Sequence, residues 1–503
     1  MTRRKVTLAL AGIFLLGFAL RIVALFYEPP HHPDEFFQYL EPAWRRLAGV
    51  GVETWEWRSG VRSWVLPGYH GAWMALLMSL GVRDGVKLVT FLRVHWMLLS
   101  LTLVWAGWRG GALLARQLSP ANAGAMGADQ DGDTSAPTPG WQGGLLAALL
   151  CAAFPLLVRF SIHTLSEPAS ILCLVWALVL SGELAEDATH GQRGKAAWVG
   201  VLLGLGVCLR IQHAPVAIMP VLWLLVARRF RLLALVSIVA LVPTFLFGVV
   251  DWLTLDGFFS SYIAYVRFNL FENGAEMFGK MARGWYAGLF FHRLPIGLPV
   301  LACLCFLGIR AGWPFVAGAL ALAVVLSTQA HKEERFAMLF WPLMLIPAAG
   351  YAGAWLAARA PPRASTPMAA GTPVPPPRRR AWLVPAGAAA FAVLILGDGA
   401  LHARGNDFAD LTPLRFEAQA WVGRQSDVTG LLFDEPLFVG GYLWLGRPFP
   451  QLLVKPALLH NPLFSHVLVP RDSDSMRDAQ RAGFTTVFST GNFVVLKRVP
   501  RSR

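Results

Sequence analysis

The sequence predicts an all-α polytopic membrane protein with a small soluble α/β domain after its last membrane span. Of the 503 residues, 55% are hydrophobic and only 15% are charged, whereas soluble globular domains are about 45–50% apolar. The mean hydropathy is +0.50. Long apolar runs recur through residues 1–400, and residues 401–503 change to charged residues and short alternating runs. We therefore expect a membrane domain followed by a second domain.

Eleven apolar runs are candidates for membrane spans, which need about 20 residues as helices. They lie near residues 6–27, 88–115, 142–160, 168–182, 197–211, 213–227, 232–250, 294–309, 313–328, 337–357 and 382–400. The first run follows the basic segment Met1–Lys5, as in a signal peptide. Because the run is long and no small-residue cleavage motif follows it, we expect an uncleaved first span.

The orientation depends on one further apolar run, residues 65–81. If this run stays at the membrane surface, most clusters of Lys and Arg fall beside the cytoplasm, which agrees with the positive-inside bias. If the run crosses, all clusters of Lys and Arg but the first fall on the outer face, against the positive-inside bias. We therefore predict that it does not cross. Residues 28–87, 251–293 and 331–335 then share the outer face with the C-terminal domain.

Two segments rich in Ala, Gly, Pro, Ser and Thr, residues 118–140 and 359–380, fall inside and are interpreted as linkers. In the C-terminal domain, alternating apolar residues predict strands at Gly430–Phe433, His466–Val469 and Phe493–Lys497.

The net charge is +14, yet nucleic acid is not expected as a partner. The basic residues are scattered between apolar runs instead of lying on one element, as cytoplasmic loop charge does in a membrane protein. The five cysteines all fall in or beside apolar segments, which indicates small core residues. They form neither a disulfide framework nor a metal-binding pattern.

The first outer loop carries the acidic motif His32-Pro33-Asp34-Glu35. Pro33 suits the first turn of a helix, and Gly49 suits its end. The apolar spacing that follows predicts an amphipathic helix lying on the membrane, kinked at Pro42. Its apolar face would consist of Phe36, Tyr39, Leu40, Ala43, Trp44 and Leu47.

The acidic pair has two possible roles. One carboxylate could act as a general base on an acceptor hydroxyl, or both could only stabilise the positive end of the helix dipole. His32 together with Asp34 and Glu35 could hold a divalent metal, but no further ligands follow at a suitable spacing. We therefore expect no cofactor.

A second polar segment, His331-Lys332-Glu333-Glu334-Arg335, lies between two apolar runs. At headgroup depth its cations could stabilise a leaving phosphate. The alternative is a cap of snorkelling basic side chains. Similar alternatives apply to Trp55 and Trp57, which could stack on sugar rings or belong to the interfacial aromatic belt.

These motifs resemble glycosyltransferase family 22, the mannosyltransferases that use dolichyl-phosphate-mannose, and most closely the branch that adds the third mannose of the glycosylphosphatidylinositol anchor. The resemblance lies in His32–Glu35, Thr54–Trp57, Arg62–Trp64 with Pro67, and His331–Phe336 leading to Trp341-Pro342. Weaker similarity runs through His163–Glu167 and Arg210.

The resemblance implies a GT-C fold, a polyprenyl-phosphate-mannose donor and a lipid-linked glycan acceptor. It also implies inverting transfer that forms an α-mannoside, with Asp34 as the base and Glu35 as its catalytic neighbour. The residues expected to bind substrate are His32, Trp55, Glu56, Trp57, Arg62, Glu167, His331, Lys332, Glu333 and Arg335.

Other function classes remain open at this stage. A GT-C enzyme could move another sugar, such as arabinose or glucose. A transporter of lipid-linked sugars would need ionisable residues near the middle of spans and internal repeats, and neither is clear. A non-catalytic scaffold would leave the acidic pair unexplained. The chain has no Asn-X-Ser/Thr sequon and is rich in Ala, Gly, Arg and Trp, so we expect a bacterial inner membrane with the site facing the periplasm.

Overall fold

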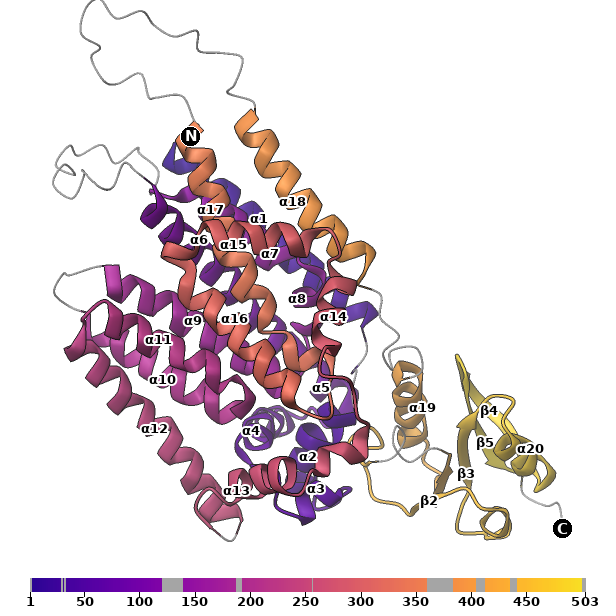
Figure 1. Cartoon of the computed structure of the whole chain (residues 1–503). Helices are drawn as coiled ribbons and strands as arrows, with labels where there is room; N and C mark the ends of the chain where they lie inside the picture. Colours follow the sequence, from indigo (N-terminus) through magenta and orange to yellow (C-terminus); the bar gives the residue numbers. More distant parts are fainter. Residues whose placement is uncertain are drawn as a thin grey trace, which may run out of the picture.

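The computed structural model shows a bundle of helices with a small β-sheet domain beside one end (Figure 1). The residues it describes are 2–28, 30, 33–119, 139–186, 192–255, 257–359, 383–403, 412–434 and 441–499. His32 and most of the two linkers, 118–140 and 359–380, lie outside this part of the chain.

All eleven predicted runs carry helix, which confirms the fold class. Within the described residues, six helical segments are long and apolar enough to span a membrane: α1 (Arg3–Tyr27), α5 with α6 (Gly85–Ser100, Thr102–Leu118), α9 (Ser166–Glu186), α12 (Phe230–Thr254), α16 (Ile309–Thr328) and η6 with α17 (Glu334–Ala337, Phe340–Arg359). The pair α14 and α15 (Trp285–Arg293, Gly297–Leu307) also passes but bends by 103°. Shorter helices complete the bundle: α7 (Trp141–Ala153), α8 (Pro155–Phe160), α10 (Arg193–Leu209), α11 (Ala214–Val226) and α18 (Leu383–Leu401).

The centre of the bundle is formed by α6, α7 and α17, which approach closely through glycines. A Cβ on Gly111 would lie 2.3 Å from the Gly143 carbonyl oxygen, and one on Gly353 would lie 2.1 Å from the Gly143 nitrogen. Small residues allow helix backbones to pack at such distances in membranes. This packing fixes α17, and the 3₁₀ turn η6 that precedes α17 carries Arg335 of the polar site described below.

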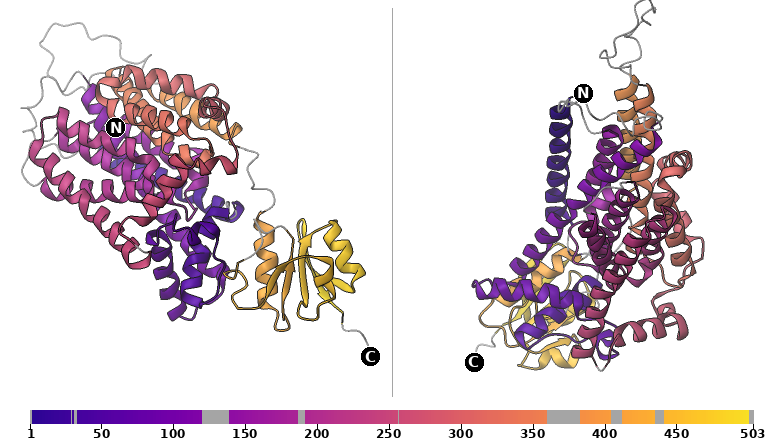
Figure 2. Two further views of the ribbon diagram at one scale, coloured as in Figure 1. Left: turned by 60° about the horizontal axis from the view of Figure 1, so that its bottom comes forward. Right: turned by 90° about the vertical axis from the view of Figure 1, so that its left-hand side faces the viewer.

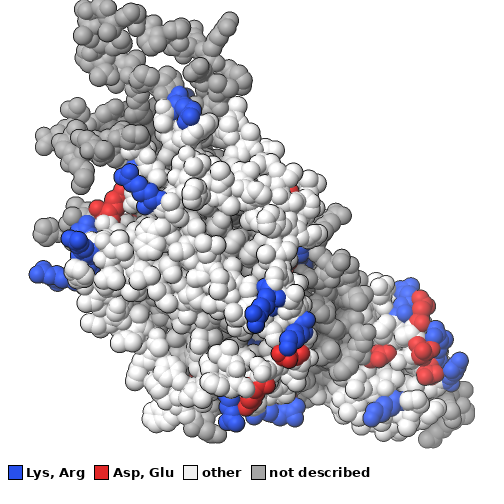
Figure 3. All heavy atoms as spheres, viewed as in Figure 1, with Lys and Arg blue, Asp and Glu red and all other residues white. Residues whose placement is uncertain are grey.

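The bundle has two ends, and the short helices that connect its long helices gather at one of them. The N-terminus and the adjoining ends of α6, α7, α17 and α18 lie at one end, whereas α2 (Glu41–Ala48), α3 (Trp55–Arg58), α4 (Val65–Ser79) and α13 (Ser260–Val266) lie at the other (Figures 1 and 2). Helix α4 has only 15 residues, fewer than the ~20 needed to cross. It lies with α2 and α3 at one end of the bundle (Figure 1), and the orientation of the run 65–81 stays a prediction. On the face drawn in Figure 3, most charged side chains lie towards these ends.

The C-terminal domain contains a five-stranded sheet of order β2-β1-β3-β5-β4. Strand β1 (Leu431–Phe433) pairs in parallel with β2 (Gln451–Leu453) and β3 (His466–Pro470), and β5 (Phe493–Arg498) pairs antiparallel with β3 and β4 (Phe484–Thr490). Helices α19 (Thr412–Arg424) and α20 (Asp474–Arg481) supply residues to clusters that bury its two faces. The three predicted strands are confirmed.

The predicted amphipathic helix consists of two parts. A π-helical segment, η1 (Glu35–Leu40), leads into α2, and Pro42 lies at the start of α2, where its missing N–H is tolerated. Gly49 ends α2 with a left-handed φ of 72°. The prediction that the apolar face lies on the membrane is wrong, because Phe36, Leu40 and Trp44 are buried against α4, α5 and the C-terminal domain.

Candidate active site

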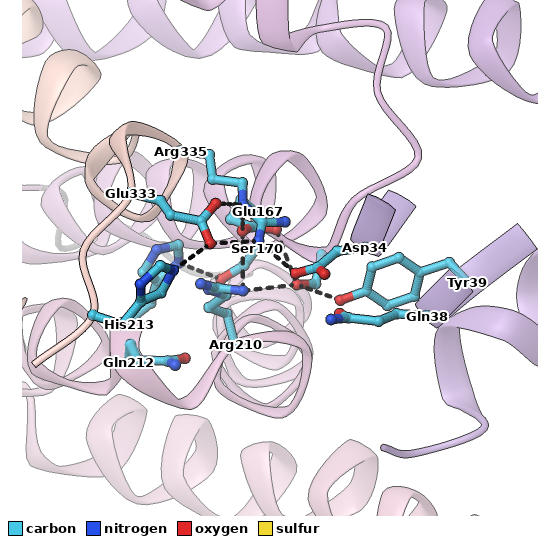
Figure 4. A network of polar contacts seen from close by, with 12 residues as sticks. Asp34, Gln38, Tyr39, Glu167, Ser170, Arg210, Gln212, His213, Glu333 and Arg335 are labelled. Carbon is cyan, nitrogen blue, oxygen red and sulfur yellow. Dashed lines mark hydrogen bonds and ion pairs between the residues drawn. The ribbon is translucent and has the colours of Figure 1, made fainter. Parts of the chain in front are cut away.

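Arg335 lies in η6, the 3₁₀ turn before α17, at the centre of a network of ionic contacts (Figure 4). Its side chain is only 4% exposed. Arg335 Nη2 lies 2.5 Å from Asp34 Oδ2, and Nε lies 2.6 Å from Glu333 Oε2 and 3.6 Å from Glu167 Oε1. One guanidinium thus joins acids from three regions of the chain, as burial of a charge requires.

A second arginine, Arg210, shares Glu167. It follows α10 in an extended conformation, and its Nη1 lies 3.0 Å from Glu167 Oε1 and 3.4 Å from the Ser166 hydroxyl. Both guanidinium groups lie over the ring of Phe336, with Cζ 4.5 Å (Arg210) and 5.1 Å (Arg335) from its centre. The pair places two buried positive charges around Glu167, and one of them, Arg335, also contacts Asp34.

A cavity of about 100 Å³ with both apolar and polar lining residues adjoins this network. Its lining includes Tyr39, Arg62, Ser166, Arg210, Gln212 and Tyr265. Arg62 Cζ lies 5.9 Å from the centre of the Tyr265 ring, and Gln212 donates a hydrogen bond to the Tyr265 hydroxyl. Two arginines and several hydroxyl groups suit a ligand that carries an anion and sugar hydroxyls.

The segment η1 holds this site together through side chains that point in different directions. The Tyr39 hydroxyl donates to Ser166 Oγ at 3.1 Å, and Gln38 Nε2 donates to Glu56 Oε1 at 3.1 Å. Glu56 Oε1 also accepts a hydrogen bond from Arg62 Nε at 3.0 Å. π-Helical turns are uncommon and often occur at functional sites.

The two residues of the acidic pair, Asp34 and Glu35, lie in different environments. The Asp34 carboxylate is 27% exposed beside Arg335. Glu35 is fully buried and accepts hydrogen bonds from the Thr164 N–H (2.8 Å) and hydroxyl (3.1 Å), with His163 Nδ1 at 2.9 Å. Burial alone would raise the pKa of Glu35, but His163 and the Thr164 N–H outweigh it and hold that pKa well below its usual value. Asp34 is therefore the acid open to a substrate, and Glu35 anchors the helix start.

The two tryptophans also differ. Trp57 is buried, donates from Nε1 to the Phe37 carbonyl at 3.2 Å and packs on Trp64 with ring centres 4.7 Å apart. Trp55 is 38% exposed and packs on Phe268 at 5.0 Å. Only Trp55 retains an exposed surface for a sugar ring.

The residues of the segment 331–335 also lie in different surroundings. Lys332 is buried, and its amine donates to the carbonyls of Gln329 and Met281. Burial, followed by the nearby charge of Arg283, lowers the pKa of Lys332. His331 Nε2 lies 2.9 Å from Glu333 Oε1. The structure therefore places Arg335 and Glu333 in the network and directs Lys332 towards backbone carbonyls.

Several residues of this site were not among the predicted site residues. They are Tyr39, Ser166, Arg210, Gln212 and Tyr265. Arg210 carried a usable signal, since an ionisable residue at the end of an apolar run marks a functional site by default. Ser166 lies in the segment His163–Glu167 of the family resemblance, whereas Tyr39 and Gln212 carry no such signal in one sequence. Among the described residues, His, Cys, Asp and Glu form no group of three that could hold a metal ion.

The chain resembles solved membrane glycosyltransferases in fold. It matches the crystal structure of ArnT from Cupriavidus metallidurans bound to undecaprenyl phosphate with a TM-score of 0.60 and 14% identity, over 99% of this chain and 98% of that one. It matches the Archaeoglobus fulgidus oligosaccharyltransferase in complex with Zn and sulfate with a TM-score of 0.53 and 13% identity, over 97% and 73%. The fold is that of the GT-C membrane glycosyltransferases.

The model of the Alg9-like mannosyltransferase family matches residues 12–404, and the chain belongs to this family. GPI mannosyltransferase 3 of Yarrowia lipolytica is 28% identical over 335 residues, which are 63% of this chain and 57% of that protein. The protein of the same name in Drosophila melanogaster is 36% identical over 107 residues, 20% of this chain and 19% of that protein. The matched parts thus cover between a fifth and just over half of these relatives. The family resemblance seen in the motifs is confirmed.

Proposed function

We propose that this protein is an inverting mannosyltransferase at the outer face of a membrane. It transfers mannose from a polyprenyl phosphate mannose donor to a hydroxyl of a lipid-linked glycan and forms an α-mannoside. The family assignment supports mannose as the sugar, and the lipid phosphate named with the ArnT structure is consistent with a polyprenyl donor. We also propose a bacterial inner membrane on the basis of the sequence composition, although the relatives named above are eukaryotic.

In this proposal Asp34 is the general base. It takes the proton of the acceptor hydroxyl, and that oxygen attacks the anomeric carbon from the side opposite the phosphate. The bond between the anomeric carbon and the phosphate oxygen breaks, and the electron pair leaves with polyprenyl phosphate. A single displacement of this kind inverts the configuration of the donor sugar.

Arg335 and Arg210 stabilise the charge that develops on the leaving phosphate. In the absence of substrate their charges are balanced by Asp34, Glu333 and Glu167. A phosphate can take the place of Asp34 on Arg335, which would free that carboxylate for base catalysis as the donor binds. Arg62 is a further cation on the wall of the cavity.

The observation that carries the proposal is the 2.5 Å contact between Asp34 and Arg335, residues 301 positions apart. It brings a candidate base and a candidate phosphate ligand into one site. The test is to reconstitute the purified protein with polyprenyl phosphates carrying mannose, glucose or arabinose, together with a lipid extract of the source membranes. Transfer of mannose alone is expected. Transfer of only another sugar, or of none, would contradict the proposal.

A further inference from the structure

The fully buried carboxylate of Glu41 joins the first outer loop to the C-terminal domain. Glu41 Oε1 accepts hydrogen bonds from the N–H groups of Val52 (2.9 Å) and Tyr442 (2.8 Å), and Oε2 accepts one from Leu443 (3.1 Å). Val52 follows α2, whereas Tyr442 and Leu443 belong to the C-terminal domain, some 400 residues along the chain. Burial of a polar carboxyl group requires such hydrogen-bond partners.

An aromatic stack lies next to this contact. Phe36, two residues after Asp34, stacks on Trp444 with ring centres 5.9 Å apart and an interplanar angle of 11°. Phe416 of α19 packs on both rings, at 5.5 Å and 4.8 Å. Phe36, Phe416 and Trp444 are all buried in one apolar cluster shared by the loop helices and the C-terminal domain.

Two glycines permit the close approach of the two parts. A Cβ on Gly85, at the start of α5, would lie 1.9 Å from the Leu443 carbonyl oxygen. Gly441 has a φ of 91°, and a Cβ there would meet the Phe36 ring at 2.6 Å and Glu41 Oε2 at 2.9 Å. Neither neighbour can yield easily, since one is backbone and the other is a packed cluster.

We propose that the C-terminal domain positions Asp34, through Phe36 and Glu41, for the transfer reaction. Side chains along η1 alternate between two supports. Glu35 and Tyr39 contact the turn before α9 and its first residue, whereas Phe36 contacts the C-terminal domain. A six-residue π-helical turn has little stability of its own, so its position depends on both supports. The proposal rests on the proposed function for the role of Asp34.

The test uses the full chain with three substitutions. Glu41→Gln removes one of two acceptor oxygens and sets an amide N–H₂ against backbone donors. Gly85→Ala inserts a methyl group against the Leu443 carbonyl. Gly68→Ala is the control, because it lies on α4 of the same loop with no atom within 4 Å of its Cβ. Hydrogen exchange is measured for peptides covering 34–41 and 441–445, with kcat and donor KM for mannose transfer.

We expect the first two variants to lose exchange protection at 441–445 and at 34–41 together. Their kcat should fall about ten- to a hundred-fold, the scale of a 1 Å misplacement, with the donor KM unchanged. Gly68→Ala should match wild type. Loss of protection at 441–445 with unchanged 34–41 and unchanged kcat would overturn the inference. If wild type transfers no mannose, the proposed function fails, and the coupled exchange alone decides whether the C-terminal domain supports this segment.

Discussion

Replacing Asp34 by Asn is the most informative perturbation of the site. Asn has nearly the same shape as Asp but cannot accept a proton as a base. General-base catalysis contributes about 10²–10⁴-fold, which corresponds to about 2.7–5.4 kcal/mol of barrier at ~1.36 kcal/mol per tenfold change in rate. We therefore expect kcat for mannose transfer to fall by about this factor.

Stability should change little in the same variant. Arg335 keeps Glu333 at 2.6 Å and Glu167 at 3.6 Å, so its buried charge is not left unpaired. The melting temperature of the detergent-solubilised protein should therefore stay close to that of wild type.

The assay follows mannose transfer from a synthetic polyprenyl phosphate mannose at saturating donor. Glu333→Gln is the matched control, because it removes another carboxylate from the same guanidinium. If Asp34 acts only by balancing the charge of Arg335, the two variants lose similar activity. If Asp34 is the base, only Asp34→Asn loses at least about a hundredfold. An Asp34→Asn enzyme within threefold of wild type would refute the assignment.

Four further outcomes are expected. Glu35→Gln should lower the free energy of unfolding by about 1–3 kcal/mol, as for a weakened buried hydrogen-bonding group, measured by denaturation. Lys332→Ala should lower the melting temperature and leave the donor KM within about twofold of the wild-type value. Arg335→Ala should raise the donor KM about ten- to a hundred-fold. The reverse pattern of donor KM values would make Lys332 the phosphate ligand. With the native cysteines replaced, Cys at Arg481 should react with impermeant thiol reagents in intact cells and Cys at Gly194 should not; the opposite labelling would invert the topology. Burial raises the pKa of Glu41 to about 7 despite its three N–H donors. The contribution of this pKa shift to the free energy of unfolding is therefore complete below the unfolded pKa of about 4.3 and is lost as the pH rises towards 7. This loss should be absent in Glu41→Gln, and identical pH profiles of the melting temperatures of wild type and variant would contradict the shift.

The membrane architecture was accessible from sequence because the bilayer sets a length for every apolar run. The charge bias similarly predicts that residues 65–81, which form the 15-residue helix α4, do not cross. The same reasoning failed for the face of Phe36 and Leu40. An apolar stripe has the same spacing whether lipid or protein covers it, and here α5 and the C-terminal domain cover it.

Part of the candidate site was accessible for a chemical reason. Acids and bases beside apolar runs are costly to bury, so Asp34, Glu167 and Arg335 stood out. Which of two neighbouring residues faces the site depends on the local backbone. The π-helical turn directs Glu35 to His163 and Thr164, and the short segment before η6 directs Lys332 to two carbonyls. Neither conformation has a signature in a single sequence.

We propose that this chain adds mannose to a lipid-linked glycan with Asp34 as the base. The most direct measurement is mass spectrometry of the lipid-linked glycans in a deletion strain of the source organism, complemented with wild type or with Asp34→Asn at equal expression. We expect a glycan lacking one hexose to accumulate in the deletion strain and in the Asp34→Asn strain, and wild type to restore the full-length glycan. An unchanged glycan profile in the deletion strain, or full restoration by Asp34→Asn, would contradict it.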